Sequence, residues 1–299
     1  MFRKLKASAV VALGCAAAGV GLAGCDGDAA AERDASAPAT RKADAALISG
    51  TKKISVAGKS VNVSCSGDQE KGKPVIVLLH GGGDGLNKMA AFQKTLSEKN
   101  RVCSYDRLGA GASAQPEGPQ SFSSTGKVLT GVLDRIAGDH PVVLAGHSMG
   151  GLIAARYAPE HKDRVKGLVL MDATPPTMSD DMKKAIPESA PGQAAQMRAQ
   201  NLAVFQGQNP EKLAMPDGKV ASAGNIPVEV IKHGKPYLAA MPKYGPQLEQ
   251  AWTAGQRKWL ALSSRSKLST AAKSGHYIYL EQPDIAVQAI QRVASQAAR

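Results

Sequence analysis

The spacing of hydrophobic and polar positions changes several times along the chain, and each change marks an element. Residues 54–63 alternate apolar and polar side chains on either side of Ala57-Gly58, which predicts a half-exposed hairpin. Residues 75–79 are all apolar, the pattern of a strand that is covered on both faces. Across residues 87–99 the large apolar side chains recur at spacings of three and four, which predicts an amphipathic helix.

Strand-like and helix-like stretches alternate over most of the remaining chain. Strands separated by helices form a parallel sheet with right-handed crossovers, so the predicted fold class is α/β. Between about residues 175 and 225 the alternation breaks, and prolines and polar helical stretches predict a small helical cap insertion over the strand ends. Further strands are expected near residues 102–105, 142–145, 165–171, 226–231 and 268–272, and further helices near residues 123–136, 246–262 and 283–298.

The first 24 residues have the pattern of an export signal peptide. Residues 3–6 carry three basic side chains, and residues 7–21 form an apolar stretch too short to span a bilayer comfortably. Leu22-Ala23-Gly24-Cys25 follows and resembles the lipobox of bacterial lipoproteins, in which cleavage leaves the cysteine as a lipidated N-terminus. The alternative is an ordinary secretory signal cut after small residues such as 16–18, which would leave Cys25 as a spare thiol.

Lipidation of Cys25 predicts an exported protein that is anchored to a bacterial membrane and faces the periplasm or the cell exterior. More than one acyl chain gives durable anchoring, because each buried CH₂ contributes about 0.8 kcal/mol. Residues 26–49 are rich in Ala, Asp, Arg and Lys and have almost no large apolar side chains, so residues 25–49 are expected to form a flexible tether. The folded domain is therefore expected over residues 50–299.

The chain is basic, with a formal net charge of +12 that falls to +9 once the three basic residues of the signal are removed. Its lysines are scattered, and it has little aromatic interleaving and no recognised nucleic-acid-binding motif, so we expect no nucleic-acid partner. A hydrophobic content of 43% suits a globular core. The sequence carries no signal for an oligomeric state.

The pentapeptide Gly146-His147-Ser148-Met149-Gly150 follows an apolar run and precedes a small-residue segment that resembles the start of a helix. This is the pattern of a nucleophile elbow, in which the flanking glycines allow a sharp strand-to-helix turn. Such a turn lifts the Ser148 hydroxyl clear of the sheet. It also directs the Met149 backbone N–H into the same space, where it can stabilise an oxyanion.

Four landmarks in order make the chain similar to the alpha/beta-hydrolase superfamily across nearly all of residues 50–299. The resemblance implies a mostly parallel eight-stranded sheet in the order 1-2-4-3-5-6-7-8, flanked by helices, with the second strand antiparallel to its neighbours. The landmarks are His80-Gly81-Gly82 after the third strand, Tyr105-Asp106-Arg107-Leu108-Gly109-Ala110-Gly111-Ala112-Ser113 after the fourth, the elbow after the fifth, and Ser274-Gly275-His276 after the last.

The same resemblance bears on the cysteines. Cys65 and Cys103 are the pair left once the signal is removed and Cys25 is lipidated, and an exported protein can form a disulfide. The implied strand order sets the end of the second strand beside the start of the fourth, which brings Cys65 close to Cys103. A disulfide is expected there, and two buried reduced thiols remain the alternative.

The resemblance also implies a catalytic triad. His276, after the last strand, is expected to be the base for Ser148, and Asp172, at the end of the sixth strand, is expected to be the acid, as in some branches of the family. The acid more often follows the seventh strand, but the carboxylates available there are Glu229, inside the strand, and Glu249, which is expected to face solvent on a helix.

The expected activity is hydrolysis of a carboxylic ester, of small-molecule or lipid origin, through an acyl-enzyme. The N–H groups of Gly82 and Met149 are expected to hold the oxyanion. No metal or other cofactor is expected, and the glycines at 81–83 lack the following Lys-Ser/Thr of a phosphate-binding loop. Two alternatives stay open: an aminopeptidase or amidase with the same triad, and a binding protein that has kept the fold without turnover.

Overall fold

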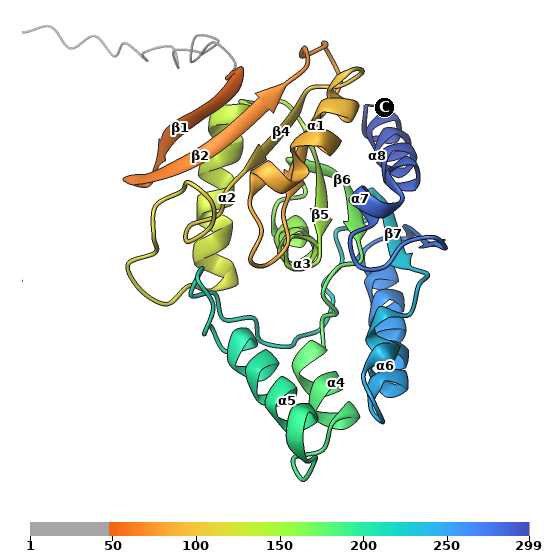
Figure 1. Cartoon of the computed structure of the whole chain (residues 1–299). Coiled ribbons are helices and arrows are strands. Elements are labelled where there is room, and N and C mark those ends of the chain that lie inside the picture. Colours follow the sequence, from red (N-terminus) through yellow and green to blue (C-terminus); the bar gives the residue numbers. More distant parts are fainter. Residues whose placement is uncertain (1–47, 299) are drawn as a thin grey trace, which may run out of the picture. The chain divides into compact units, whose positions relative to one another are not determined.

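The computed structural model describes residues 48–298, and the predicted signal peptide, Cys25 and most of the tether lie outside this range. Eight strands form one sheet in the order β1-β2-β4-β3-β5-β6-β7-β8 (Figure 1). The predicted fold class and strand order are confirmed. The strands are β1 (Gly50–Val56), β2 (Lys59–Ser66), β3 (Val75–Leu79), β4 (Val102–Tyr105), β5 (Val142–His147), β6 (Val165–Met171), β7 (Pro227–His233) and β8 (Arg265–Ala271).

The β2 strand is antiparallel to both of its neighbours, β1 and β4, and every other pairing in the sheet is parallel. Cys65 on β2 lies directly opposite Cys103 on β4, with their Cα atoms 4.1 Å apart, and a disulfide joins them. The antiparallel hairpin is therefore covalently tied to the parallel part of the sheet.

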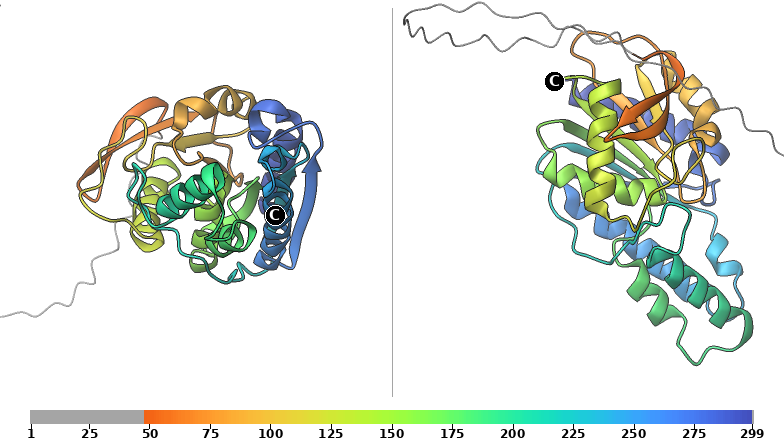
Figure 2. Two further views of the ribbon diagram at one scale, coloured as in Figure 1. Left: turned by 60° about the horizontal axis from the view of Figure 1, so that its bottom comes forward. Right: turned by 90° about the vertical axis from the view of Figure 1, so that its left-hand side faces the viewer.

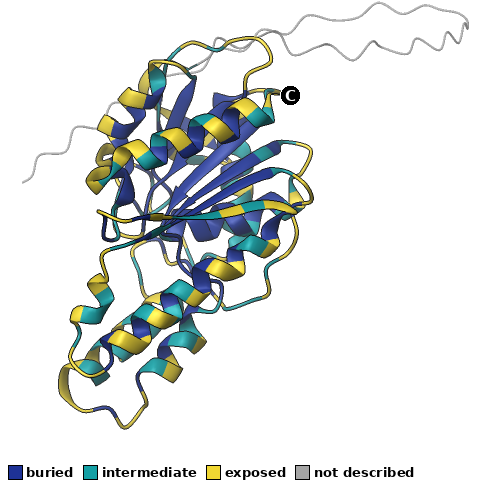
Figure 3. Cartoon of the chain, turned by 90° about the vertical axis from the view of Figure 1, so that its right-hand side faces the viewer, coloured by how far each residue is buried: buried dark blue, intermediate teal, exposed yellow. Residues whose placement is uncertain are grey.

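The central strands are buried on both faces, which explains their continuous apolar sequence. Val75, Val77 and Leu79 pack into one core with α2 and α3, whereas Ile76 and Leu78 pack into a second core with α1 and α8. Figure 3 shows these strands in the colour of buried residues, with half-exposed helices around them. The α-helices are α1 (Ala90–Ser97), α2 (Phe122–Ile136), α3 (Met149–Tyr157), α4 (Met178–Ala185), α5 (Gly192–Phe205), α6 (Gly245–Lys258), α7 (Ile278–Glu281) and α8 (Pro283–Ala297).

Short 3₁₀ helices account for two of the differences from the expected element boundaries. The helix expected over residues 87–99 begins with a 3₁₀ turn before α1, and the one expected over residues 246–262 ends with a 3₁₀ turn after α6. The short helix α7 follows His276 and was not expected. The 3₁₀ helices are η1 (Leu86–Met89), η2 (Ala158–Glu160), η3 (Tyr237–Ala240) and η4 (Trp259–Leu262).

The chain between β6 and β7 contains α4 and α5, which lie beyond the carboxyl ends of the strands (Figures 1 and 2). Apolar side chains of α4 form a separate small core with α6, whereas α5 contains no fully buried residue. Arg156 of α3 donates hydrogen bonds to the carbonyl oxygens of Pro176, Gly218 and Lys219. The two ends of this segment are thus held side by side by one arginine.

Within the described residues, no helix has both the length and the apolar character needed to cross a membrane.

Candidate active site

Ser148 stands between the end of β5 and the start of α3 with a backbone φ of 50°, in the left-handed region that residues other than glycine rarely adopt. The flanking glycines make this turn possible. A Cβ atom on Gly146 would lie 2.5 Å from backbone atoms of Gly150, and one on Gly150 would lie 2.3 Å from the carbonyl oxygen of Leu79. The close approach of β5, α3 and β3 holds the serine in its strained conformation.

Backbone hydrogen bonds fix the turn further. The Ser148 N–H donates to the carbonyl oxygen of Met171, and the Ser148 carbonyl oxygen accepts from the N–H groups of Gly151, Leu152 and Thr174. The turn is therefore tied to the end of β6 as well as to its own helix.

Asp172 and His276 are brought together although 104 positions separate them in the sequence. Asp172 directly follows β6, has a φ of 46° and is fully buried. His276 lies in the loop after β8, and its Nδ1–H donates a hydrogen bond of 2.7 Å to Asp172 Oδ2. This leaves the other ring nitrogen, Nε2, available for proton transfer.

The Asp172 carboxylate accepts three further hydrogen bonds at Oδ1. They come from the Trp252 indole N–H at 2.9 Å, the His233 backbone N–H at 3.1 Å and the His233 ring Nδ1–H at 2.9 Å. Burial alone would raise the pKa of Asp172, but the hydrogen bonds and charges of His233 and His276 outweigh it and lower that pKa to about 2. Asp172 is therefore an ionised carboxylate at neutral pH.

Glu249 does not face solvent, so that expectation is wrong. Its Oε1 lies 2.5 Å from His233 Nε2, and its side chain is only 18% exposed. The reason is the position of Glu249 on α6, between the buried residues Leu248 and Trp252, on the side of the helix that packs toward β7. Glu229 instead pairs with Arg292 of α8, away from this cluster.

His147, inside the elbow, contacts His276 directly. The two ring centroids are 4.6 Å apart, and His147 Nε2–H donates to the His276 carbonyl oxygen at 2.9 Å. Burial, with a smaller contribution from the nearby His276, lowers the pKa of His147 to about 3, so this ring is neutral near pH 7. Among the described residues, no hydrogen bond joins Ser148 Oγ to His276, a geometry that often tightens only when substrate binds.

The two residues that are expected to supply the oxyanion donors are neighbours in space. A Cβ atom on Gly82 would lie 3.6 Å from the Met149 side chain. Met149 is the first residue of α3, where backbone N–H groups have no partner within the helix. The Gly82 N–H has no acceptor in the part of the chain that the structure describes.

A buried ion pair supports the loop that carries Gly82. Arg107 donates to Glu211 through Nε and Nη2 at 2.6 and 2.8 Å, and to the carbonyl oxygens of His80 and Gly81 at 2.6 and 2.9 Å. Burial, with the adjacent Arg107 charge, lowers the pKa of His80 well below its usual value, so the ring is neutral. Arg107 belongs to a motif that was recognised in the sequence. No sequence pattern indicated its partner Glu211, which lies in the segment between β6 and β7.

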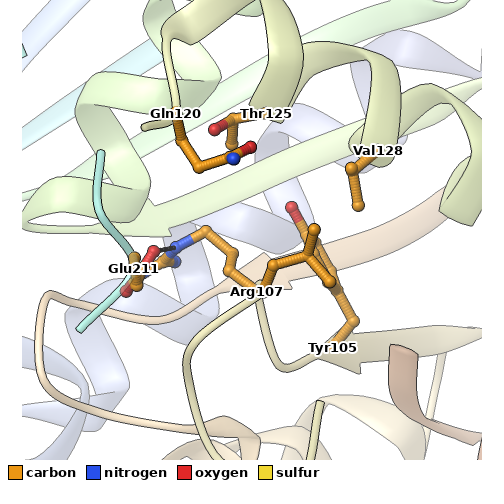
Figure 4. Close-up of a pocket in the computed structure, with 7 residues that line it drawn as sticks. Tyr105, Arg107, Gln120, Thr125, Val128 and Glu211 are labelled. Atoms are coloured by element: carbon orange, nitrogen blue, oxygen red, sulfur yellow. Dashed lines mark hydrogen bonds and ion pairs between the residues drawn. The ribbon is translucent and has the colours of Figure 1, made fainter. Parts of the chain in front are cut away.

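A cavity of about 10 Å³ lies beside this ion pair and not at Ser148; Figure 4 shows Arg107 and Glu211 pointing toward one another next to Tyr105. It has room for about one water molecule. The Tyr105 hydroxyl lines the cavity and has no hydrogen-bond partner among the described residues. Residues 48–298 contain no cluster of three or more His, Cys, Asp or Glu side chains that could hold a metal ion.

Several curated proteins resemble part of the chain. The human (lyso)-N-acylphosphatidylethanolamine lipase is 30% identical over 113 residues, which are 37% of this chain and 33% of that protein. The human 1-acylglycerol-3-phosphate O-acyltransferase ABHD5 is 30% identical over 138 residues, 45% of this chain and 38% of that protein. The chain thus matches about a third of the length of these relatives.

Solved structures match more of the chain at lower identity. VinJ superposes with a TM-score of 0.60 at 18% identity, covering 83% of this chain and 99% of that protein. The enol-lactonase from Burkholderia xenovorans LB400 has a TM-score of 0.57 at 21% identity, covering 82% and 100%. A family model described as alpha/beta hydrolase fold matches residues 74–227. Because this family model matches more than half of the chain, and the sheet has the strand order expected from the resemblance, the chain belongs to the alpha/beta hydrolase family.

Proposed function

We propose that the protein is a serine hydrolase that cleaves carboxylic esters through an acyl-enzyme on Ser148. The observation that carries the proposal is the 2.7 Å hydrogen bond between His276 and the buried Asp172 carboxylate, at the same edge of the sheet as the strained serine. A neutral hydroxyl is a weak nucleophile, and an oriented imidazole is the group that activates it.

In the proposed mechanism, Ser148 Oγ attacks the ester carbonyl carbon while His276 Nε2 takes the hydroxyl proton. Asp172 holds the Nδ1–H tautomer and stabilises the imidazolium that forms. The N–H groups of Gly82 and Met149 donate to the oxyanion of the tetrahedral intermediate. His276 then protonates the leaving alcohol, and a water molecule, activated by the same imidazole, hydrolyses the acyl-enzyme.

The names of the relatives favour a lipid-like acyl substrate. They include (lyso)-N-acylphosphatidylethanolamine lipases and 1-acylglycerol-3-phosphate O-acyltransferases, whose names refer to acylated lipids. Hydrolysis of p-nitrophenyl esters of graded chain length tests this point: a preference for long chains supports a lipid-like substrate, and a preference for acetate contradicts it.

Labelling by a fluorophosphonate tests the proposed chemistry itself. The wild-type protein and the Ser123→Ala control, which alters an exposed serine of α2, are expected to be labelled, and Ser148→Ala is not. Ser148→Ala should also lower kcat by about 10⁴-fold or more. An unlabelled wild-type protein would favour the reading as a non-catalytic binding protein.

We also propose, from the sequence alone, that the protein is exported and held on a membrane surface by lipid on Cys25. Metabolic labelling with a fatty acid in a bacterial host should mark the wild-type protein and not Cys25→Ser, and the variant should leave the membrane fraction. Equal membrane recovery of both proteins, without label, would contradict the lipid anchor.

A further inference from the structure

The Asp172 carboxylate is shared between two imidazoles. His276 donates to Oδ2 at 2.7 Å, and the His233 ring Nδ1 lies 2.9 Å from both Oδ1 and Oδ2. The proposed mechanism uses His276 and gives no role to His233. His233 ends β7 and is 1% exposed, so it is as deeply buried as the carboxylate it contacts.

The second ring nitrogen of His233 also meets a carboxylate. Its Nε2 lies 2.5 Å from Glu249 Oε1, which comes from α6. An ionised carboxylate only accepts hydrogen bonds, and a neutral imidazole has a single N–H. Both contacts are satisfied together when the ring is an imidazolium with a proton on each nitrogen. In that form His233 bridges the two carboxylates as a positive charge.

The electrostatics agree with this arrangement. Burial lowers the pKa of His233, but the hydrogen bonds and charges of Asp172 and Glu249 outweigh burial and raise that pKa above its usual value. A buried cation next to a single carboxylate would leave the outer ring nitrogen unpaired, and Glu249 removes that cost.

We propose that His233 and Glu249 are positioning residues, an inference that rests on the proposed function. They fix the Asp172 carboxylate toward His276 and keep His276 in its general-base form at lower pH. Neither residue contacts Ser148 through any hydrogen bond among the described residues. Glu249 acts through His233, and His233 acts through Asp172.

The sign of the effect on His276 follows from the charges. The Asp172 carboxylate favours the protonated form of His276, whereas a positive His233 beyond it disfavours that form. The other basic groups near His276 are His147, which is neutral near pH 7, and Lys88, which pairs with Asp84. The titratable groups that face the His233 ring are Asp172, Glu249 and Tyr237. Those that face the His276 ring are Asp172, His147, Tyr237 and Tyr277, and Lys88 lies over the Tyr277 ring.

The Glu249→Gln variant tests the proposal. It removes one carboxylate with little change in shape, so His233 becomes neutral and no longer offsets Asp172. The acid limb of kcat/KM for p-nitrophenyl butyrate should then move up by about one pH unit. The kcat/KM of the variant should fall about tenfold relative to wild type below the limb and stay within about threefold above it. A structural role alone would lower both regions equally.

Glu229→Gln is the matched control, since Glu229 is also a buried carboxylate, on the same strand as His233, but it pairs with Arg292. Its acid limb is expected to coincide with that of the wild type. A limb that stays in place in Glu249→Gln, or moves equally in Glu229→Gln, overturns the proposal.

A second measurement does not depend on turnover. In histidine-labelled protein, ¹⁵N NMR should show protons on both nitrogens of His233 at pH 7, and Glu249→Gln should lose one of them while Glu229→Gln keeps both. A neutral His233 in the wild type overturns the proposal even if esters are hydrolysed. If NMR shows the His233 imidazolium but the fluorophosphonate does not label the protein, the proposed function alone is overturned.

Discussion

The candidate site has two halves that are held in different ways. On the nucleophile side, Ser148, Gly82 and Met149 are placed by the backbone, through a strained φ of 50° and helix and strand contacts that allow only glycine at Gly146 and Gly150. On the acid–base side, side chains do the placing, through hydrogen bonds that join a carboxylate to two imidazoles and an indole.

The two halves are therefore sensitive to different kinds of substitution. A backbone-built half depends on steric fit, so a single added methyl group can displace it without any change of charge. A half built from side chains depends on protonation and charge, so isosteric substitutions can disable it while the fold stays intact.

On the acid–base side a large effect is expected from Asp172→Asn, which changes charge and tautomer with almost no change in shape. An amide neither enforces the Nδ1–H tautomer of His276 nor stabilises its imidazolium as a carboxylate does, so kcat should fall by about 10⁴-fold. Steady-state kinetics with a p-nitrophenyl ester measure this, and circular dichroism should show an unchanged fold. A fall of less than about tenfold would mean that another group supplies the acid.

A smaller but clear effect is expected from Gly150→Ala on the backbone-built half. The new Cβ would lie 2.3 Å from the Leu79 carbonyl oxygen, so α3 must move away from β3. The free energy of unfolding in urea should fall by about 3 kcal/mol. Gly118→Ala is the control, since a Cβ atom there has no neighbour within 4 Å, and its stability should be close to that of the wild type. Equal stability of the two variants would show that the elbow is not close-packed.

An effect that builds up gradually with pH is expected where the halves meet, at His147. Its pKa is about 3 in the folded protein and near 6.5 when unfolded, so the unfolded state binds one more proton between these values. Stability should therefore fall as pH drops from 6.5 toward 3, with His147 contributing about 1.4 kcal/mol per pH unit. Urea unfolding between pH 4 and 6 should give a shallower slope for His147→Gln. Parallel slopes would mean that His147 is protonated in the folded state.

The nucleophile half could be predicted from the sequence because each of its parts depends on a few consecutive residues. The Gly-x-Ser-x-Gly pattern and the glycines at 81–83 require particular backbone turns, and such turns leave a local signature. The eight strands and their order followed from four such landmarks through the family resemblance. Asp172 and His276 were expected for the same reason, since each directly follows a strand.

The support behind Asp172 could not be predicted in the same way. Glu249 and His233 meet through packing of α6 on β7, and Arg107 and Glu211 meet across 104 positions of sequence. One signal was present: Glu249 lies three residues before Trp252, so both share one face of the helix. A charged residue on the face that carries a buried tryptophan indicates a partner inside the protein.

Arg156 ties together the two ends of the segment between β6 and β7. Because Pro176 and Gly218 are hydrogen-bonded to each other and to this one side chain, the segment leaves and re-enters the sheet through a single narrow neck. The α5 helix inside the segment has no fully buried residue and can change with little strain on the strands beneath, whereas Glu211 is held by Arg107 and Leu213 lies in the main core. The segment therefore joins a helix that is free to vary to a buried carboxylate that must stay in place for the Gly82 loop to keep its support.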